Sequence, residues 1–438
     1  MARVCIIGAG SSGIASCQVL QARGIEFDCF EKGSGIGGNW RYGNDNGMSS
    51  AYRSLFINTS RAMMEYATYP MPDDYPDYPH HTQIARYFEG YVDHFGFRDR
   101  IRFNTEVARV EPAGDGWEVT LADGESHRYD AVMVANGHHW DPKYPEPPFP
   151  GQASFTGEQL HSHWYREPDE RFVDRRVLVL GIGNSATDIA TETSRVSATT
   201  YLAMRRGAYV MPKFIGGVPL DQLAPSWANR LPFAFTRPLL MREVKRVQGP
   251  MEGYGLPKPD HKLGEAHPTV SADLLDRIGH GRIAVKPNLE RIDGPVVHFC
   301  DGTSAEVDTI VWCTGYRVEV PFLDAASVGP EPASLRLYKR VLHLDQRDLF
   351  FIGLMQSTGS AFPILERQSQ LLAAHLTGTW APPSRARMRA DCEWRYRRAL
   401  RRWGPHGRPT MRVDFDRYMH EHGVEIERGR RRAARNGA

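Results

Sequence analysis

The feature that most constrains the fold of this chain is a glycine-rich turn near its N-terminus. Residues 3–8 form a short apolar segment that runs into the sequence Gly8-Ala9-Gly10-Ser11-Ser12-Gly13, and a helical pattern follows. A second apolar segment ends at Glu31, 18 residues after Gly13. In such a strand–turn–helix–strand unit the glycines permit a tight turn, close approach of a pyrophosphate and close helix–strand packing. The sequence therefore predicts a dinucleotide-binding unit, whose predicted cofactor residues are Gly8, Gly10, Ser12, Gly13 and Glu31.

The same pattern returns in the middle of the chain. Residues 176–180 are apolar, a turn over residues 181–186 follows, and a strand over 199–204 ends at Arg205 and Arg206. Arginine pairs with a 2′-phosphate through charge-assisted hydrogen bonds, whereas a carboxylate in the place of Glu31 would repel it. The sequence therefore predicts NADPH rather than NADH, unless the two arginines only form a solvated strand end. The predicted contacts are Gly181, Gly183, Asn184, Ser185, Ala186, Thr187, Arg205 and Arg206.

Two dinucleotide sites in one chain imply electron transfer between two cofactors, and the natural pair is a flavin and a nicotinamide. We predict an α/β fold with two Rossmann-like domains, in which an NADPH domain is inserted into an FAD domain. Two apolar runs that end in glycine turns, 130–137 and 308–315, are expected to border the insertion points. The predicted boundaries are 1–160 and 301–380 for the FAD domain, 161–300 for the NADPH domain with an insertion over 211–281, and 381–438 for an Arg-rich C-terminal helical tail.

Composition narrows the class of protein further. The 438 residues are 41% hydrophobic and 24% charged, and no run approaches the ~18 apolar residues of a membrane span. The N-terminus lacks the pattern of a signal peptide, and the six cysteines include no CxxC pair, so we expect a cytoplasmic protein without disulfides. The histidine pairs 80–81 and 138–139 are adjacent residues that point in different directions, so no metal site is predicted.

The C-terminal segment is strongly basic, although the whole chain has a net charge of only +2. From Ala381 onward it holds sixteen arginines, no lysine and seven acidic residues. Aromatic residues at 394, 396 and 403 interrupt the charge, and we interpret the first half as an amphipathic helix packed by its aromatic face. We therefore do not expect a nucleic-acid partner.

A segment between the two units carries a family resemblance. Residues 155–166, FTGEQLHSHWYR, match the complete FxGxxxHSxx[Y/F][K/R] signature of the flavin-containing monooxygenases. Residues 55–60, 71–76, 183–185 and 313–316 also resemble segments of that family. Baeyer–Villiger relatives have Trp-Pro where this chain has Tyr165-Arg166. Because the chain ends in Arg-rich polar sequence rather than an apolar anchor, it resembles the soluble bacterial-type members.

The resemblance implies a reaction. In that family NADPH reduces FAD, and reduced flavin adds O2 to form a C4a-hydroperoxide, which NADP+ and an asparagine at the position of Asn58 protect. The peroxide then oxygenates a soft nucleophile, an amine nitrogen or a sulfide sulfur. Asn58 is therefore the predicted catalytic residue, although an asparagine in Asn-Thr-Ser could also only cap a turn. The further predicted cofactor contacts are Gly38, Asn39, Trp40, Met48, Thr59, Val107 and Gln356.

Three other functions stay open at this stage. A Baeyer–Villiger oxygenase would use the same intermediate on a ketone. A flavin disulfide reductase shares the two-nucleotide plan but needs a redox cysteine pair. A flavoprotein sensor or structural subunit would have no catalysis, although the intact glycine turns argue against it. The expected partners are a small-molecule substrate and O2, without nucleic acid or membrane, and a homodimer is possible.

Overall fold

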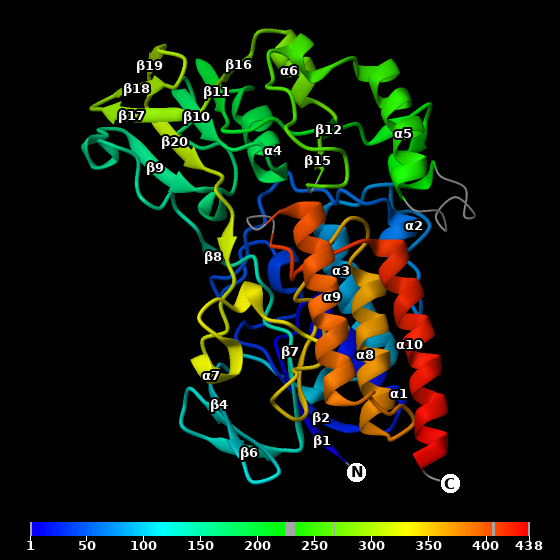
Figure 1. Cartoon of the computed structure of the whole chain (residues 1–438). Helices are drawn as coiled ribbons and strands as arrows, with labels where there is room; N and C mark the ends of the chain where they lie inside the picture. Colours follow the sequence, from blue (N-terminus) through cyan, green and yellow to red (C-terminus); the bar gives the residue numbers. More distant parts are fainter. Residues whose placement is uncertain (1, 224–232, 267, 405–407, 437–438) are drawn as a thin grey trace. The chain divides into compact units, whose positions relative to one another are not determined.

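The computed structural model describes residues 2–223, 233–266, 268–404 and 408–436. The chain divides into two compact units (Figure 1). Unit 1 consists of residues 1–51, 55–141 and 317–438, and unit 2 consists of residues 52–54 and 142–316. Each unit is built around a parallel sheet, and each is described separately below.

The sheet of unit 1 contains five parallel strands in the order β22-β7-β1-β2-β3. These strands are β1 (Arg3–Ile7), β2 (Glu26–Phe30), β3 (Ile101–Arg102), β7 (Ala131–Val134) and β22 (Leu349–Phe351). Strands β7 and β22 are buried at every position. Continuous apolar runs of this kind are typical of parallel strands covered on both faces. The strand that precedes the first glycine turn, β1, lies at the centre.

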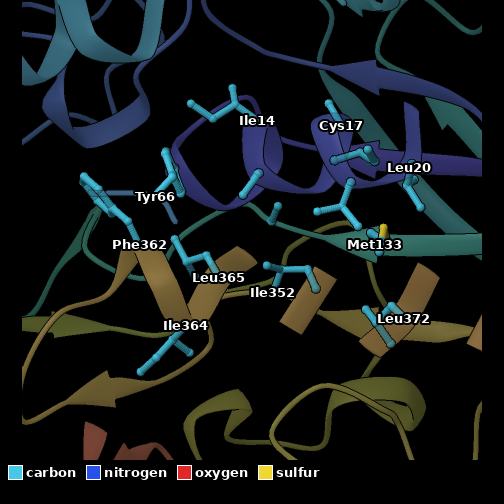
Figure 2. Packing of buried hydrophobic residues seen from close by; sticks show 14 of the residues in the cluster. Ile14, Cys17, Leu20, Tyr66, Met133, Ile352, Phe362, Ile364, Leu365 and Leu372 are labelled. Carbon is cyan, nitrogen blue, oxygen red and sulfur yellow. The ribbon is translucent and has the colours of Figure 1, made fainter. Parts of the chain in front are cut away.

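Helices α1 (Ser11–Ala22) and α8 (Phe362–Leu376) pack together in unit 1. Figure 2 shows this core, to which α1 contributes Ile14 and Leu20 and α8 contributes Leu365 and Leu372. Helix α3 (His81–Phe95) begins with a capping box formed by His80 and Gln83. The short helix α2 (Arg61–Met64) and an antiparallel sheet of β4 (Val107–Ala113), β5 (Gly116–Leu121) and β6 (Ser126–Tyr129) also belong to this unit.

The C-terminal segment folds as two long helices, α9 (Arg385–Trp403) and α10 (Phe415–Asn436), which belong to unit 1 (Figure 1). Our prediction that the first of them packs by its aromatic face is wrong. The buried residues of α9 are Met388, Cys392 and Ala399, whereas Trp394 is 52% exposed. Small and flexible side chains allow closer helix packing than an indole ring does, and Trp394 instead lies under arginine side chains.

The sheet of unit 2 repeats this arrangement with the order β16-β11-β10-β20-β9, again with parallel pairs throughout. Its strands are β9 (Glu158–His161), β10 (Arg176–Leu180), β11 (Thr199–Ala203), β16 (Ile283–Lys286) and β20 (Thr309–Trp312). Helix α4 (Asn184–Thr193) follows β10, which lies at the centre of the sheet. Strands β17 (Leu289–Asp293), β18 (Val296–Phe299) and β19 (Ser304–Glu306) form a separate antiparallel sheet.

The described part of the predicted insertion over 211–281 contains one long helix and several short elements, and its residues 224–232 and 267 lie outside the described ranges. The elements of this region are β12 (Val210–Met211), β13 (Phe214–Ile215), β14 (Val218–Pro219), α5 (Phe233–Gln248), β15 (Thr269–Val270) and α6 (Leu274–Gly279). Strand β12 pairs with β15, and β13 pairs with β14.

The unit boundaries differ from the predicted ones. The chain passes between the units after Asp141 and after Tyr316, rather than at 160/161 and 300/301. The reason is strand pairing, because β9 and β20 are neighbours in the second sheet and carry residues 142–160 and 301–316 into unit 2. The fold class itself is confirmed, since both units have a parallel sheet with a strand–glycine turn–helix unit at its centre.

Candidate functional site

The first glycine turn joins β1 to α1, and the protein's own packing requires two of its glycines. Gly8 has a φ of +103°, and a Cβ there would lie 2.8 Å from the Ala135 carbonyl oxygen. A Cβ at Gly13 would lie 1.8 Å from the Gly8 carbonyl oxygen. Both positions exclude any larger residue for steric reasons. They position α1 on β1 but do not by themselves show that a ligand binds.

Gly10 is different, because the protein leaves room beside it. A Cβ at Gly10 would meet only Gly38, at 3.7 Å from its Cα, which is an ordinary contact. Gly10 also begins α1 without a side-chain cap, so that the first N–H groups of the helix are not bonded by a capping side chain. Open space beside uncapped helix N–H groups fits the pyrophosphate of a dinucleotide. The residues present therefore fit FAD at this position.

Glu31 lies at the end of β2 and is only 4% exposed. Its Oε2 accepts a hydrogen bond from the Ala9 N–H at 2.8 Å, and its Oε1 accepts from the Gly33 N–H at 2.8 Å and from Asn46 Nδ2 at 3.0 Å. The acid is thus fixed directly against the glycine turn. An ionised carboxylate offers about four acceptor positions, so capacity remains for a ribose hydroxyl. Sequence reasoning missed Asn46, which carried no signal of its own.

Asn58 lies between the buried Ile57 and α2. The Ile57 N–H donates to the Pro79 carbonyl, and Ser60 is the N-cap residue of α2. Within the described ranges the partly buried Asn58 side chain makes no hydrogen bond, so it does not cap this turn. Its amide is available to donate to and accept from a ligand, as the catalytic prediction requires.

The other predicted flavin contacts occupy several elements of unit 1. Asn39 Oδ1 accepts a hydrogen bond from the Ser50 N–H at 2.8 Å. The Trp40 and Phe362 rings pack edge to face, with 6.5 Å between their centres. The Gln356 N–H donates to the Met411 carbonyl. Gly38 has a φ of +53° and approaches the first glycine turn at Gly10. The remaining members of the set are Ser12, Met48 and Thr59, which are partly buried, and Val107, which begins β4 and is buried.

The second glycine turn joins β10 to α4 with a similar geometry. Gly181 has a φ of +139°, and a Cβ there would lie 2.7 Å from the Cys313 carbonyl oxygen. A Cβ at Gly183 would meet nothing within 4 Å, and Gly183 begins α4 without a side-chain cap. Ser185 and Ala186 follow in the first turn of the helix, and the Thr187 hydroxyl donates to the Asn184 carbonyl at 2.9 Å. This turn fits a second dinucleotide for the same reasons as the first.

Strand β15 of the insertion holds the second turn in place. Asn184 Oδ1 accepts from the Val270 N–H at 2.8 Å, and the Thr269 hydroxyl donates to the Ile182 carbonyl at 2.5 Å. Asn184 stays a predicted cofactor contact, and its side-chain oxygen is bonded to the protein. Sequence reasoning missed Thr269 and Val270, because nothing local marks two residues more than 80 positions away as partners.

Arg205 and Arg206 follow β11 and are both exposed. Arg206 Nε lies 3.3 Å from Asp260 Oδ2, in an exposed ion pair with the insertion. Among the described residues Arg205 makes no ion pair. The two arginines are therefore not equivalent, because among the described residues only Arg206 has an acidic partner.

A polar cluster under α4 was not predicted. The Tyr52 hydroxyl donates to the Asp188 carboxylate, and the Ser54 hydroxyl donates to Glu192 Oε2 at 2.8 Å. These bonds explain why residues 52–54 belong to unit 2. Burial raises the pKa of Asp188 to about 6, against the opposing effect of the Tyr52 hydrogen bond. A carboxyl group that titrates near neutral pH thus lies on the helix that follows the second glycine turn.

The geometry defines a two-dinucleotide oxidoreductase fold, and comparison with known proteins identifies its family. The family model "Flavin-binding monooxygenase-like" matches residues 1–429. The chain is 36% identical over 440 residues to flavin-containing monooxygenase 5 of Oryctolagus cuniculus, covering 96% of this chain and 81% of that protein. It is 34% identical over 443 residues to dimethylaniline monooxygenase (N-oxide-forming) 2 of Mus musculus, covering 97% and 82%. The structure of S-allyl-L-cysteine S-oxygenase from Allium sativum aligns with a TM-score of 0.73 and 26% identity, covering 97% and 88%.

The chain belongs to the flavin-binding monooxygenase-like family. This confirms the predicted enzyme class, an oxidoreductase that acts as a monooxygenase with FAD and NADPH. Among the described residues, no helix combines the length and the apolar character that crossing a membrane requires.

Proposed function

We propose that this enzyme oxygenates an amine nitrogen or a sulfide sulfur, and that it does so with FAD bound at the first glycine turn and NADPH at the second. The observation that carries the assignment is the family match over residues 1–429 together with room beside both Gly10 and Gly183. The N-oxide-forming and S-oxygenating relatives support the choice of a soft nucleophile over a ketone.

When bound, the flavin supplies the oxygen chemistry, and the protein supplies binding, orientation and shielding from water. Glu31 would hold the ribose of the first nucleotide, and the uncapped N-terminus of α1 would bind its pyrophosphate. The N-terminus of α4 would do the same for the second nucleotide, and Arg205 would bind the 2′-phosphate. The domain assignment follows from these roles, with unit 1 as the FAD domain and unit 2 as the NADPH domain.

Asn58 acts in the oxidative half of the cycle. Hydride transfer requires stacking of the nicotinamide on the flavin and makes little demand on an amide at this position. Product formation requires a neutral group that can both donate and accept while NADP+ and the substrate are held in place. Asn58 meets this requirement, because its amide is partly buried and is not bonded to other described residues.

The test uses the purified enzyme with three substrate types, a tertiary amine, a thioether and a cyclic ketone. We expect NADPH consumption coupled to an N-oxide or S-oxide. A lactone from the ketone as the main product would overturn the proposal in favour of Baeyer–Villiger oxygenation.

The same assay tests the role of Asn58. Asn58→Leu should retain FAD and anaerobic reduction by NADPH, but should release hydrogen peroxide in place of product. Ala62→Ser, a conservative change at an exposed position of the neighbouring helix α2, serves as the control for local disturbance. If Asn58→Leu keeps the wild-type yield of product per NADPH, the catalytic assignment is wrong.

The cytoplasmic location and the homodimer stay predictions of the sequence. Sedimentation analysis of the FAD-loaded enzyme distinguishes a monomer of 49.5 kDa from a dimer.

A further inference from the structure

The arginines of the C-terminal segment gather around one cavity in unit 1. This cavity has a volume of about 70 Å³ and lies among α9, α10 and β24 (Arg412–Val413). Six arginines line it, namely Arg340, Arg395, Arg398, Arg402, Arg412 and Arg417. Only two acidic residues, Asp414 and Glu421, line it with them. The walls therefore carry a large excess of positive charge.

The acidic residues around the cavity are already engaged. Glu421 pairs with Arg395 at 2.5 Å and with Arg417 at 2.6 Å. Asp414 Oδ2 lies 3.3 Å from Arg402. Each carboxylate therefore already pairs with at least one arginine of the wall.

Arg398 lines the same cavity but belongs to neither of these ion-paired groups. Its guanidinium lies over the Trp394 ring, 5.5 Å from the ring centre, and no carboxylate of the described residues lies within ion-pair distance. Partial burial, followed by the charge of Arg417, lowers the pKa of Arg398. Burial, followed by the charges of Arg408 and Arg402, lowers the pKa of Arg412. The charges of Glu421 and Asp414 oppose this shift at Arg398. The guanidinium groups of Arg402, Arg412 and Arg417 nevertheless line the same cavity as Arg398, and an anion placed between them would reduce their mutual repulsion.

The size and charge of the cavity fit a small, highly charged ligand. A water molecule needs roughly 10–15 Å³ of such free volume, so this cavity has room for several waters or for one small oxyanion. Guanidinium groups present paired N–H donors that match the oxygens of phosphate. We propose that this cavity binds a compact oxyanion of the phosphate class that carries at least two negative charges.

The structure favours a small anion over a nucleic acid. Single-stranded nucleic acids bind through a basic groove and free aromatic faces on which bases stack. Trp394 is 52% exposed, but two arginines already lie against its ring, Arg398 at 5.5 Å and Arg417 at 5.8 Å from the ring centre. The positive charge converges on one cavity, which is the arrangement that concentrates a single small ligand.

A bound anion would connect three parts of unit 1. Arg398 lies on α9, Arg417 lies on α10 and Arg412 lies on β24. Strand β24 pairs with β23 (Gln356–Ser357), so that Arg412 stands opposite Gln356. The anion would thus stabilise the C-terminal helices against a strand that contains a predicted flavin contact.

The test titrates the FAD-loaded enzyme with inorganic phosphate and with pyrophosphate. Saturating NADP+ is present so that both dinucleotide sites are filled, and sodium chloride at equal ionic strength is the reference. We expect saturable binding by calorimetry and a raised melting temperature, since a ligand that binds only the folded state stabilises it. Arg398→Gln should weaken binding about tenfold or more, because a charge-assisted contact is lost. Arg412→Gln should have a similar effect.

The matched control is Arg401→Gln, an exposed arginine of α9 that does not line the cavity, which should leave affinity unchanged. The visible flavin spectrum and the melting temperature without phosphate verify that each variant is folded. Equal weakening by Arg398→Gln and Arg401→Gln would overturn the proposal, because general surface charge would explain it. Absence of saturable binding to the wild type would also overturn it. A third result would overturn the proposal as well: phosphate does not bind, but anionic phospholipid vesicles or a single-stranded oligonucleotide do, and Arg398→Gln abolishes that binding.

Discussion

The glycine turn of unit 1 ends in Gly13, whereas the turn of unit 2 has Ala186 at the same place. A Cβ at Gly13 would lie 1.8 Å from the Gly8 carbonyl oxygen, so that α1 is packed too tightly against β1 for any side chain. In unit 2 there is room for the Cβ of Ala186. A Cβ added to Gly181 would lie 3.4 Å from it. The middle glycines of both turns, Gly10 and Gly183, have no close neighbour in the protein. The outer glycines therefore reflect packing within the protein, and only the middle glycine of each turn indicates a ligand.

The largest effects are expected when a side chain replaces the hydrogen of the middle glycine in each turn. Gly10→Val should yield a folded protein that retains essentially no FAD, because the side chain takes the space of the pyrophosphate. Gly183→Val should keep FAD and lose NADPH-dependent reduction. The flavin absorbance of the purified variants and anaerobic reduction by NADPH measure both effects. Full flavin occupancy in Gly10→Val would remove unit 1 as the FAD site.

The second test exchanges the third residues. Gly13→Ala should destabilise the fold by roughly 3 kcal/mol or more, since even overpacking against movable side chains costs about 1–3 kcal/mol and here the obstacle is backbone. Ala186→Gly should cost only about 1 kcal/mol, the helix-propensity difference. Urea unfolding of both variants gives the two values. An equal loss of unfolding free energy in the two variants would contradict the difference in helix packing.

The third test sharpens the contrast between the acid that ends β2 and the arginines that follow β11. Arg205→Ala should raise the apparent constant for NADPH about ten- to hundredfold, because a charge-assisted hydrogen bond contributes about 1.5–3 kcal/mol. NADH should be affected much less. Arg206→Ala should have a smaller effect, since Arg206 already pairs with Asp260. If both variants weaken the binding of NADPH and of NADH by the same factor, the 2′-phosphate is held elsewhere.

The fourth test concerns the next turn of each helix, where α1 has the buried Ala15 and α4 has Asp188. With its pKa raised to about 6, folded Asp188 keeps its proton at pH values where the unfolded chain, near 3.9, has lost it. The unfolded state is therefore favoured progressively between about pH 4 and pH 6.

Asp188→Asn removes this penalty while its oxygen still accepts from the Tyr52 hydroxyl. The variant should gain stability relative to wild type as the pH rises from 4 to 7, by at most about 3 kcal/mol and less to the extent that water reaches the partly buried carboxyl. Urea unfolding at both pH values provides the measurement. A stability difference that is the same at both pH values would show that Asp188 titrates normally.

The sequence was sufficient for features that depend on neighbours along the chain. Both strand–turn–helix units, the acid Glu31 and the arginines after β11 lie where local patterns predicted them. It failed where distant segments meet. The pairing of β9 with β20 moved both unit boundaries, and the bonds of Asn184 to Val270 and of Tyr52 to Asp188 join residues more than 80 positions apart. No periodicity or motif encodes such contacts, because they depend on which distant strands and loops lie next to each other in the folded chain.

The bonds between β15 and the second glycine turn have a consequence for protein engineering. A foreign 211–281 segment without a hydroxyl at position 269 would leave the Ile182 carbonyl without the donor that Thr269 provides, and proline at position 270 would remove the N–H that bonds Asn184 Oδ1. A chimera that exchanges this segment therefore has to retain a threonine at position 269 and avoid proline at position 270, so that the second glycine turn keeps both bonds.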